Sequence, residues 1–583
     1  MSEPTDGITT EIKSFFGREY NLLILAAVIG TLAGAASTVF RWMIDFFAKV
    51  FSGEGLLLGL SAGAVMLLMP FMPMLGGLVI GMARRYFPEA VAESGVDRVM
   101  EAVVLKNGKI RKRVLTVCAL TSSITIGSGG SAGRVGPTVQ ICSVIGSVFG
   151  QMFKLSKERI RVLVGCGAAA GIAATFNAPL AGVIFVMEII LGEFTIHSLS
   201  PIVIASVMGT VTGRAIEGNE LTFLTPVHEL VHPSEIFFYL ILGILCGLTA
   251  NLFTQTFYRS QKFFEEQVNI SVVLKPALGG LIVGLLAILT PEIRGNGFPE
   301  MEQVLNGQLF WAMALVLIFT KIFATAVTLG SGGVGGTFAP SLFIGAMVGA
   351  TFGAAVHGVL PEWTASSETY ALVGMGALAS AVMQAPLTSI LILFEMTNDY
   401  TIILPIMICC IVATYTMRRF TQNSIYEQTL LNRGVNIRHG KAINILSRMF
   451  VRDVMTQEVV TISEEMPFKN ILEIVSYSRH LYYPVVDSEG EMTGIISFSN
   501  IRDAAQNEGM EETALARDLA TPGVVALKPN HNLNEALKKF SELDVQQLPV
   551  LQVGDSKKVV GMLRQSDVQA VYNREILISE LKS

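Results

Sequence analysis

Long apolar runs separated by short polar segments dominate the chain up to about residue 435. The longest runs cover residues 22–40, 56–83, 237–253, 313–329 and 402–417. A helix needs about 20 apolar residues to span a bilayer, and these runs reach or approach that length. Other runs are short or interrupted by Gly and Pro, which is typical of helices that enter a membrane without crossing it. The pattern predicts a polytopic α-helical, multi-pass integral membrane protein that contacts membrane lipid.

The apolar part contains two copies of one unit. Residues 127–137 (GSGGSAGRVGP) recur in looser form at residues 330–340 (GSGGVGGTFAP), 203 residues later. A second pair consists of a proline followed nine residues later by a glutamate, at Pro179 and Glu188 and again at Pro386 and Glu395. Internal repeats in a membrane protein predict an inverted-repeat architecture whose broken helices meet near the bilayer midplane, where transported ions bind.

The composition becomes polar after residue 435, and the remainder resembles a soluble α/β domain. Two stretches there repeat the order strand, helix, strand, strand, helix, and each is too small to form a comfortable core alone, which predicts that they pair. The predicted parts are a cytoplasmic N-terminus (1–19), a transmembrane domain (20–435) with repeats at about 20–210 and 235–430, a linker (436–449), and soluble units at 450–508 and 514–575.

Charge and composition exclude several classes of protein. Only 15% of the 583 residues are charged, and the formal net charge is −5. The mean hydropathy is +0.54. These values do not fit a soluble enzyme, and they give no support to nucleic-acid binding. Basic clusters at residues 106–113, 154–161 and 418–419 flank apolar runs and indicate cytoplasmic loops. We expect both termini to be cytoplasmic and, in a bacterium, the location to be the inner membrane.

Cysteine and histidine residues give no sign of a metal site. All six cysteines lie in apolar sequence, none forms a metal-ligand spacing, and a reduced interior without disulfides is the favoured interpretation. His228 and His232 are four residues apart in a Pro-containing loop, without a neighbouring Cys or carboxylate cluster. We therefore expect no metal, and no cofactor is required.

The glycine-rich repeats have the chemistry of an anion site. Glycines have no Cβ, so they let the chain turn tightly where a helix begins. A proline in the first turn of that helix loses no hydrogen bond, because its missing N–H would have no partner there. The first-turn N–H groups and the positive end of the helix dipole attract an anion. Because no full positive charge is needed, the anion is also free to leave. The alternative for glycines further along, at Gly146, Gly150, Gly349 and Gly353, is close helix packing, and we assign them to it.

These motifs resemble those of the CLC family of chloride channels and chloride/proton antiporters. The family's Gly-Lys/Arg-Glu-Gly-Pro motif corresponds to residues 133–137, its Gly-x-Phe-x-Pro motif to 336–340, and its Gly-Ser-Gly-Ile-Pro motif, weakly, to 93–97. The resemblance implies a homodimer in which each subunit has its own pore for chloride. It also implies the following anion-binding and pore residues: Ser94, Arg134, Val135, Gly136, Thr337, Phe338, Ala339 and Tyr426. In this view the hydroxyls of Ser94 and Tyr426 donate to the anion, and Phe338 closes one side.

Two departures from the family pattern bear on mechanism. Antiporters of the family have a proton-carrying glutamate where this chain has Val135, and an inner proton-relaying glutamate where it has Ile189. Neither residue titrates, so coupled exchange lacks both proton stations. The favoured hypothesis is a chloride-selective channel that conducts passively and is not an enzyme. The alternatives are an antiporter with a non-standard proton route and a chloride-binding membrane sensor.

Two pairs of acidic residues in the apolar part of the chain need an explanation. Glu93 and Asp97 stand where the family has Gly and Pro, and a carboxylate near a helix start would repel an entering anion unless it points to the surface. Glu188 and Glu395 occupy equivalent repeat positions, which favours a structural role in capping or pairing over proton transfer.

The soluble pair resembles tandem CBS domains. Each unit contains a Pro-Val dipeptide and ends with a motif similar to Gly-x-x-x-x-Ser-Asp. The last residue of that motif is Asn500 in the first unit and Asp567 in the second. In that family the closing Asp often binds the ribose of an adenine nucleotide. The resemblance therefore implies a nucleotide as an optional ligand of Thr461, His480, Asn500 and Asp567. The alternative is that Asp567 only caps the N-terminus of a helix starting at Val568.

Overall fold

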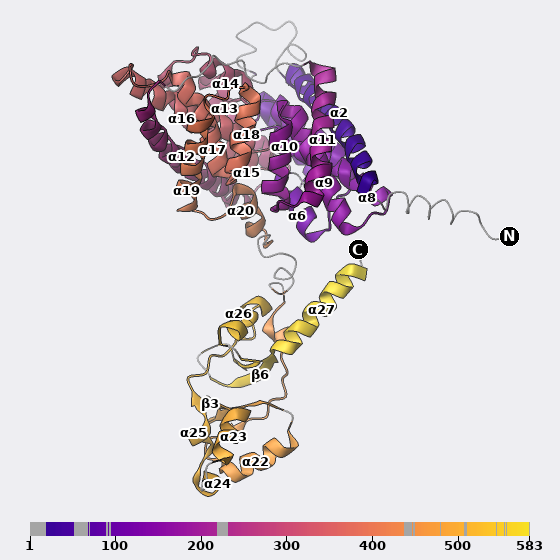
Figure 1. Cartoon of the computed structure of the whole chain (residues 1–583), viewed down its shortest axis with the longest axis vertical. Coiled ribbons are helices and arrows are strands. Elements are labelled where there is room, and N and C mark those ends of the chain that lie inside the picture. Colours follow the sequence, from indigo (N-terminus) through magenta and orange to yellow (C-terminus); the bar gives the residue numbers. More distant parts are fainter. Residues whose placement is uncertain are drawn as a thin grey trace, which may run out of the picture. The chain divides into compact units, whose positions relative to one another are not determined.

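The computed structural model describes residues 19–51, 68, 70–88, 91, 95–218, 231–435, 446, 449–478, 480–506, 510–543, 545–552, 554 and 557–581. The chain forms two compact units, Met1–Val435 and Asn436–Ser583. The first unit is helical, and the second combines short strands with helices (Figure 1).

Helices of the first half of the apolar unit follow the predicted runs closely. They are α2 (Glu19–Phe51), α4 (Phe71–Tyr86), α6 (Val96–Leu105), α7 (Arg113–Gly127), α8 (Val135–Met152), α9 (Lys157–Phe176), α10 (Pro179–Phe185), η1 (Val186–Leu191) and α11 (Ile196–Glu217). The run at 22–40 lies in α2, which continues to Phe51. The described part of the run at 56–83 ends in α4.

The second half repeats this order. Its elements are η2 (Pro233–Glu235), α12 (Ile236–Lys262), η3 (Phe263–Gln267), α13 (Leu274–Leu289), η4 (Pro291–Ile293), α14 (Phe298–Leu305), α15 (Trp311–Gly330), α16 (Phe338–Val359), α17 (Ser367–Met383), α18 (Pro386–Thr397), α19 (Ile403–Arg418) and α20 (Ile425–Asn432). Six described helices of the unit are long and apolar enough to cross a membrane, and five more are apolar but shorter. The mixture of long and short apolar helices is the one that the sequence predicts.

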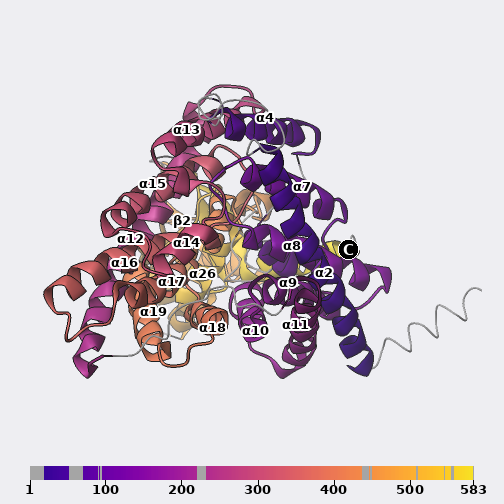
Figure 2. The ribbon, with the colours of Figure 1, turned by 90° about the horizontal axis from the view of Figure 1, so that it is seen from above.

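The two repeats meet at their glycine-rich segments. Figure 2 shows the indigo-to-purple half beside the pink-to-orange half, with α4 next to α13. At the junction the Gly133 amide donates to the Gly336 carbonyl over 2.7 Å, and the Gly336 amide donates to the Gly133 carbonyl over 2.8 Å. Around this pair the Ser131 amide donates to the Thr328 hydroxyl, and the Val334 amide donates to the Thr125 hydroxyl. The predicted fold class, a helical repeat protein with an α/β tail, is confirmed.

Glu188 and Glu395 cap each other's repeat. The Glu188 carboxylate accepts hydrogen bonds from the Thr388 amide (2.8 Å) and the Thr388 hydroxyl (2.6 Å) at the start of α18. The Glu395 carboxylate accepts from the amides of Leu180 and Ala181 at the start of α10, over 3.0 and 2.7 Å. A carboxylate at a helix N-terminus satisfies free N–H groups and the helix dipole. The structural role expected for this pair is confirmed, and it is reciprocal capping between the repeats.

Glycines inside α8 and α16 permit close helix packing. A Cβ at Gly146 would lie 1.9 Å from the Leu163 carbonyl oxygen on α9, and a Cβ at Gly349 would lie 2.0 Å from the Tyr370 carbonyl oxygen on α17. Both distances are far inside van der Waals contact, so only glycine fits. The assignment of these glycines to packing is confirmed.

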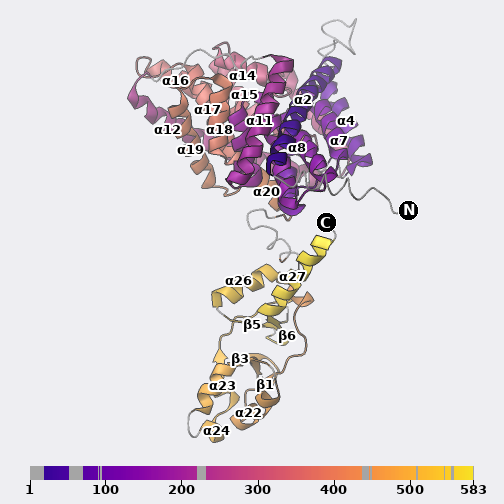
Figure 3. The ribbon, with the colours of Figure 1, turned by 45° about the vertical axis from the view of Figure 1, so that its right-hand side comes forward.

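The soluble unit contains two small α/β modules that exchange their leading segments. The elements are η5 (Val451–Asp453), β1 (Ile462–Ser463), α22 (Phe468–Tyr477), β2 (Tyr482–Val486), β3 (Met492–Ser497), α23 (Phe498–Ala505), α24 (Met510–Thr513), α25 (Ala516–Leu519), β4 (Thr521–Pro522), α26 (Leu533–Leu543), β5 (Gln547–Leu551), β6 (Val559–Arg564) and α27 (Gln565–Leu581). The strand orders are β1-β2-β3-β4 in one sheet and β5-β6 in the other. Figure 3 shows β1 and β3 in one module and β5 and β6 in the other.

The exchange explains why the modules pair. Strand β4 precedes the second module but joins β3 of the first, and Ala516 and Leu519 are buried in the first core. Conversely, Val451 precedes the first module but lies in the second core. Thr456 likewise bridges to Met562 in β6. Each core is therefore completed by residues from the other module, which is the form that the predicted pairing takes.

Candidate functional site

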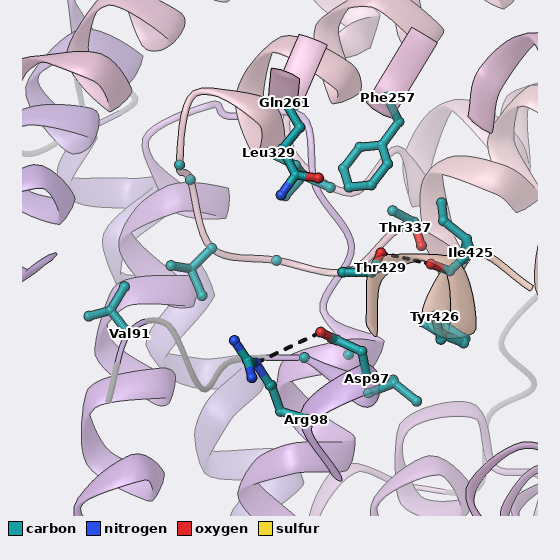
Figure 4. A pocket seen from close by; sticks show the side chains of 18 of the residues that line it. Val91, Asp97, Arg98, Phe257, Gln261, Leu329, Thr337, Ile425, Tyr426 and Thr429 are labelled. Atoms are coloured by element: carbon teal, nitrogen blue, oxygen red, sulfur yellow. Dashed lines mark hydrogen bonds and ion pairs between the residues drawn. The ribbon is translucent and has the colours of Figure 1, made fainter. Parts of the chain in front are cut away.

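A cavity of about 330 Å³ opens where the two repeats meet. Its lining includes Gly136 from the first repeat, the glycine-rich segment ending at Thr337 from the second, and Tyr426 from α20. Figure 4 shows Thr337 and Tyr426 together on one side of the cavity and Asp97 with Arg98 below them. Three of the residues predicted for the anion path, from separate parts of the sequence, thus line one cavity.

Two helix N-termini meet beside this cavity. Helix α8 begins at Val135 and α16 begins at Phe338, and in each the motif proline is the third residue. First-turn N–H groups have no acceptor within their own helix, so both ends carry free donors and the positive end of a dipole. Val135, Phe338 and Ala339 are all buried, and the Phe338 ring lies against Phe176 with centroids 5.6 Å apart. The arrangement suits a dehydrated anion held by backbone dipoles.

Tyr426 is fixed by the start of its helix. Ser424 and Glu427 form a reciprocal capping box at the N-terminus of α20, and the Tyr258 hydroxyl donates to the Ile425 carbonyl over 2.7 Å. The Tyr426 side chain is buried, and its hydroxyl interacts with that of Thr337. One tyrosine hydroxyl is therefore held at the cavity by a rigid short helix.

Ser94 and Glu93 lie outside the described residues, so only the end of their motif can be placed. Gly95, which precedes α6, has a φ of +127°, and its amide donates to the Gln140 side chain. Gln140 lies on α8, one and a half turns beyond Val135, and the sequence interpretation overlooked it. A long polar residue on the buried face of an otherwise apolar helix was the available signal.

Asp97 does not point to the surface. Its side chain is buried in the second position of α6 and lines the cavity. One of its oxygens accepts from Arg433 over 3.0 Å, and the same oxygen lies 3.9 Å from the Arg98 guanidinium. The sequence interpretation missed Arg433. Its signal was a lone cation directly after the short helix that carries Tyr426, seven residues further along the chain.

Arg134 occupies a different environment from the other predicted pore residues. Its guanidinium lies over the Phe298 ring, 5.1 Å from the centroid, and donates to the Thr175 carbonyl over 3.4 Å. It lines a second cavity of about 10 Å³ together with Arg41 and Glu217. Arg134 therefore does not join Thr337 and Tyr426 around the large cavity.

The two residues predicted at the proton stations, Val135 and Ile189, are both apolar and buried. Val135 is the first residue of α8, and Ile189 lies in η1, which packs against α6 and α9. Neither side chain can bind a proton or a hydrogen-bonding partner.

The residues predicted for a nucleotide do not form an open site. The Asn500 side chain accepts from the amide and hydroxyl of Ser497 and is used in a capping box. His480 contacts Arg564 (3.2 Å) beside a cavity of about 10 Å³, which has room for about one water molecule. Asp567 is the third residue of α27, because that helix begins at Gln565. The expectation that Asp567 caps a helix starting at Val568 is therefore wrong. Thr461 directly precedes β1 and does not line this cavity.

His232 is hydrogen-bonded and the six cysteines are buried in the described part of the chain. His228 lies outside the described residues, and the His232 ring nitrogen bonds to the Ser234 hydroxyl over 2.7 Å. All six cysteines are buried and none forms a disulfide.

Two helix N-termini that meet beside a cavity at the junction of two membrane repeats are the arrangement of an ion-transport protein, and the tail is a pair of α/β modules. The sequence model for the voltage gated chloride channel family matches residues 75–418, and that for the CBS domain matches residues 451–507 and 516–573. The chain belongs to the CLC family, carries two CBS domains, and is an integral membrane transport protein rather than an enzyme.

Similar proteins in this family include both kinds of transport protein. The chain is 35% identical over 418 residues to a putative chloride channel protein ClcB-like from Ralstonia nicotianae, covering 70% of this chain and 96% of that protein. It is 32% identical over 425 residues to the H(+)/Cl(-) exchange transporter ClcA of Vibrio parahaemolyticus, covering 70% and 89%. A crystal structure of a slow cyanobacterial Cl⁻/H⁺ antiporter superposes with a TM-score of 0.65 at 27% identity, covering 71% of this chain and 97% of that one.

Proposed function

We propose that this protein is a chloride-selective channel that conducts passively, with no coupling to protons. The observation that carries the proposal is the pair Val135 and Ile189, which are apolar where antiporters of the family have their two proton-binding glutamates. Transport coupled to protons needs a group that binds and releases one at each station. The backbone donors of α8 and α16 remain, so anion binding is kept while the proton path is interrupted.

The anion is proposed to pass from the cavity lined by Thr337 and Tyr426 to the N-terminus of α8 at Val135 and Gly136, with Phe338 and Ala339 at the N-terminus of α16. Ser94 and Arg134 stay in the proposal on the strength of the family motif. The proposal includes a homodimer with one pore per subunit and both termini in the cytoplasm, in a bacterium at the inner membrane; family membership and the basic clusters support it.

An antiporter with a different proton route is the second candidate. The named exchange transporters among its relatives favour it, as does Asp97, a buried carboxylate that lines the cavity. Against it stands the ion pair between Asp97 and Arg433, which gives that carboxylate a structural partner. A chloride-binding sensor is the third candidate. Chloride efflux from liposomes containing the purified protein distinguishes it: the channel proposal expects efflux above that of protein-free liposomes, and its absence would favour the sensor.

Tyr426→Phe is expected to change anion selectivity without affecting folding. The substitution removes one hydroxyl donor at the cavity and keeps the ring that fills the space. A lost hydrogen bond to an ion is worth about 1.5–3 kcal/mol at most, and less where water replaces it, so a partial change is expected. The measurement is the chloride/nitrate permeability ratio. Tyr415→Phe, on the exposed side of α19, is the control and should match the wild type. An unchanged ratio for Tyr426→Phe would place the inner site elsewhere.

We also propose that an adenine nucleotide binds the CBS pair, contacting Asp567 and the His480 region, including Thr461, with Asn500 as a weaker contact. Because the cavity beside His480 is small, binding requires the modules to separate there, and Arg564 would then be free to meet a phosphate. Calorimetry on the full-length protein should show micromolar to millimolar binding of ATP, ADP or AMP that Asp567→Ala weakens. No heat and no thermal shift with any of the three would leave the pair as a structural brace.

A further inference from the structure

The ion pair between Asp97 and Arg433 forms part of the lining of the large cavity. It joins the first turn of α6 to the residue that follows α20, 336 positions later in the sequence. The two closest atoms are 3.0 Å apart, and only 8% of Asp97 is exposed. Arg98 is a weaker partner of the same carboxylate, because it lies 3.9 Å away and binds Glu101 at 2.5 Å (Figure 4). Arg433 is therefore the main counter-charge of Asp97.

The positive and negative side chains that line the cavity are nearly equal in number. Among the described lining residues, three arginines (Arg84, Arg98, Arg433) face two carboxylates (Asp97, Glu265). Arg84 and Arg433 each interact electrostatically with Glu265. These described lining residues thus carry one more positive than negative charge, and the loss of a single arginine would cancel that excess. A cavity without excess positive charge would no longer concentrate anions.

A bare carboxylate at this place would oppose anion entry. Asp97 stands at the positive end of α6, so it satisfies the dipole that would otherwise attract an anion. Its negative charge in a partly desolvated cavity also repels an approaching anion directly. The pairing with Arg433 cancels both effects, since the guanidinium is held within hydrogen-bond distance of the carboxylate.

We infer that Arg433 sets the rate of anion passage through the cavity, because its charge makes the cavity passable to anions despite Asp97. The inference rests on the proposed chloride transport. It explains how the chain can tolerate an acidic residue in a motif that should attract anions. It also assigns a transport role to the residue that directly follows α20.

Chloride efflux from liposomes tests this with four full-length variants. Arg433→Gln should lower efflux about tenfold, which corresponds to ~1.4 kcal/mol of added barrier. Asp97→Asn combined with Arg433→Gln should recover efflux to within about twofold of wild type, since an electrostatic defect disappears with the charge that causes it. Asp97→Asn alone should conduct at least as well as wild type. Arg419→Gln, an exposed arginine outside the cavity, is the control and should behave as wild type.

Each outcome decides between the alternatives. An unchanged rate for Arg433→Gln, or a double variant no faster than Arg433→Gln, would overturn the inference while leaving chloride transport intact. Absence of efflux from the wild type would instead overturn the proposed function. If Arg433→Gln does not elute as folded protein, the efflux rates of Asp97→Asn and Arg433→Lys test the inference instead. The inference expects efflux near or above wild type from both, and a loss in Asp97→Asn would contradict it.

Discussion

Val135→Glu is expected to block chloride flux at neutral pH and to release the block on acidification. Val135 is the first residue of α8, so a carboxylate there would compete with the anion for the same free N–H groups and dipole. An unperturbed glutamate has a pKa of about 4.3, so the side chain is charged at pH 7 and becomes neutral as the pH falls through that range. We expect efflux to fall by about tenfold or more at pH 7, a barrier of ~1.4 kcal/mol or more.

Two controls separate charge from size in this experiment. Val135→Gln has nearly the same shape as the glutamate variant without its charge, so any effect on efflux should not depend on pH between about 4 and 7. Val135→Glu should also remain uncoupled from protons, because Ile189 still interrupts the inner path. Equal pH dependence of the glutamate and glutamine variants would show that Val135 is not at the anion path.

Gly349→Ala is expected to prevent or severely weaken folding. The new Cβ would lie 2.0 Å from the Tyr370 carbonyl oxygen and 2.7 Å from the Ala371 Cα, and both of these atoms belong to the backbone of α17. Backbone atoms cannot rotate away, so α16 and α17 would have to separate. Overpacking of a well-packed core typically costs about 1–3 kcal/mol, and this contact should lie at or above the upper end of that range.

Gly358→Ala provides the matched control, because it makes the same change on the same helix. A Cβ at Gly358 would have no atom within 4 Å. Thermal unfolding of the two purified variants in detergent, followed by tryptophan fluorescence, is the measurement. We expect Gly358→Ala to match the wild type and Gly349→Ala to unfold at a much lower temperature or fail to accumulate. Equal midpoints would contradict the close packing of α16 on α17.

The fold could be predicted well because the patterns that indicate it involve residues that are close together in the sequence. The repeated glycine motifs, the apolar runs and the reciprocal positions of Glu188 and Glu395 all lie in short stretches of sequence. The structure then shows why the glutamates recur, since each caps a helix of the other repeat. Sequence alone could not give this exchange, because periodicity within one repeat does not say which repeat supplies the partner.

Contacts between distant segments could not be predicted in the same way. The partner of Asp97 is Arg433, and no spacing rule connects residues so far apart, so the acidic residue appeared only as an obstacle to anions. The exchange of leading segments between the CBS modules was hidden for the same reason. The sequence indicated Asn500 as a nucleotide ligand, whereas its side chain completes a capping box with Ser497 three residues earlier.

The reversal potential of the reconstituted protein under combined chloride and pH gradients tests the central claim most directly. Passive chloride conduction predicts a reversal potential at the chloride equilibrium value, unchanged when the pH on one side is altered, because Val135 and Ile189 cannot carry protons. In sealed liposomes a chloride gradient should then drive no uphill proton movement. A reversal potential that shifts with the pH gradient, or uphill proton uptake driven by chloride, would contradict the account.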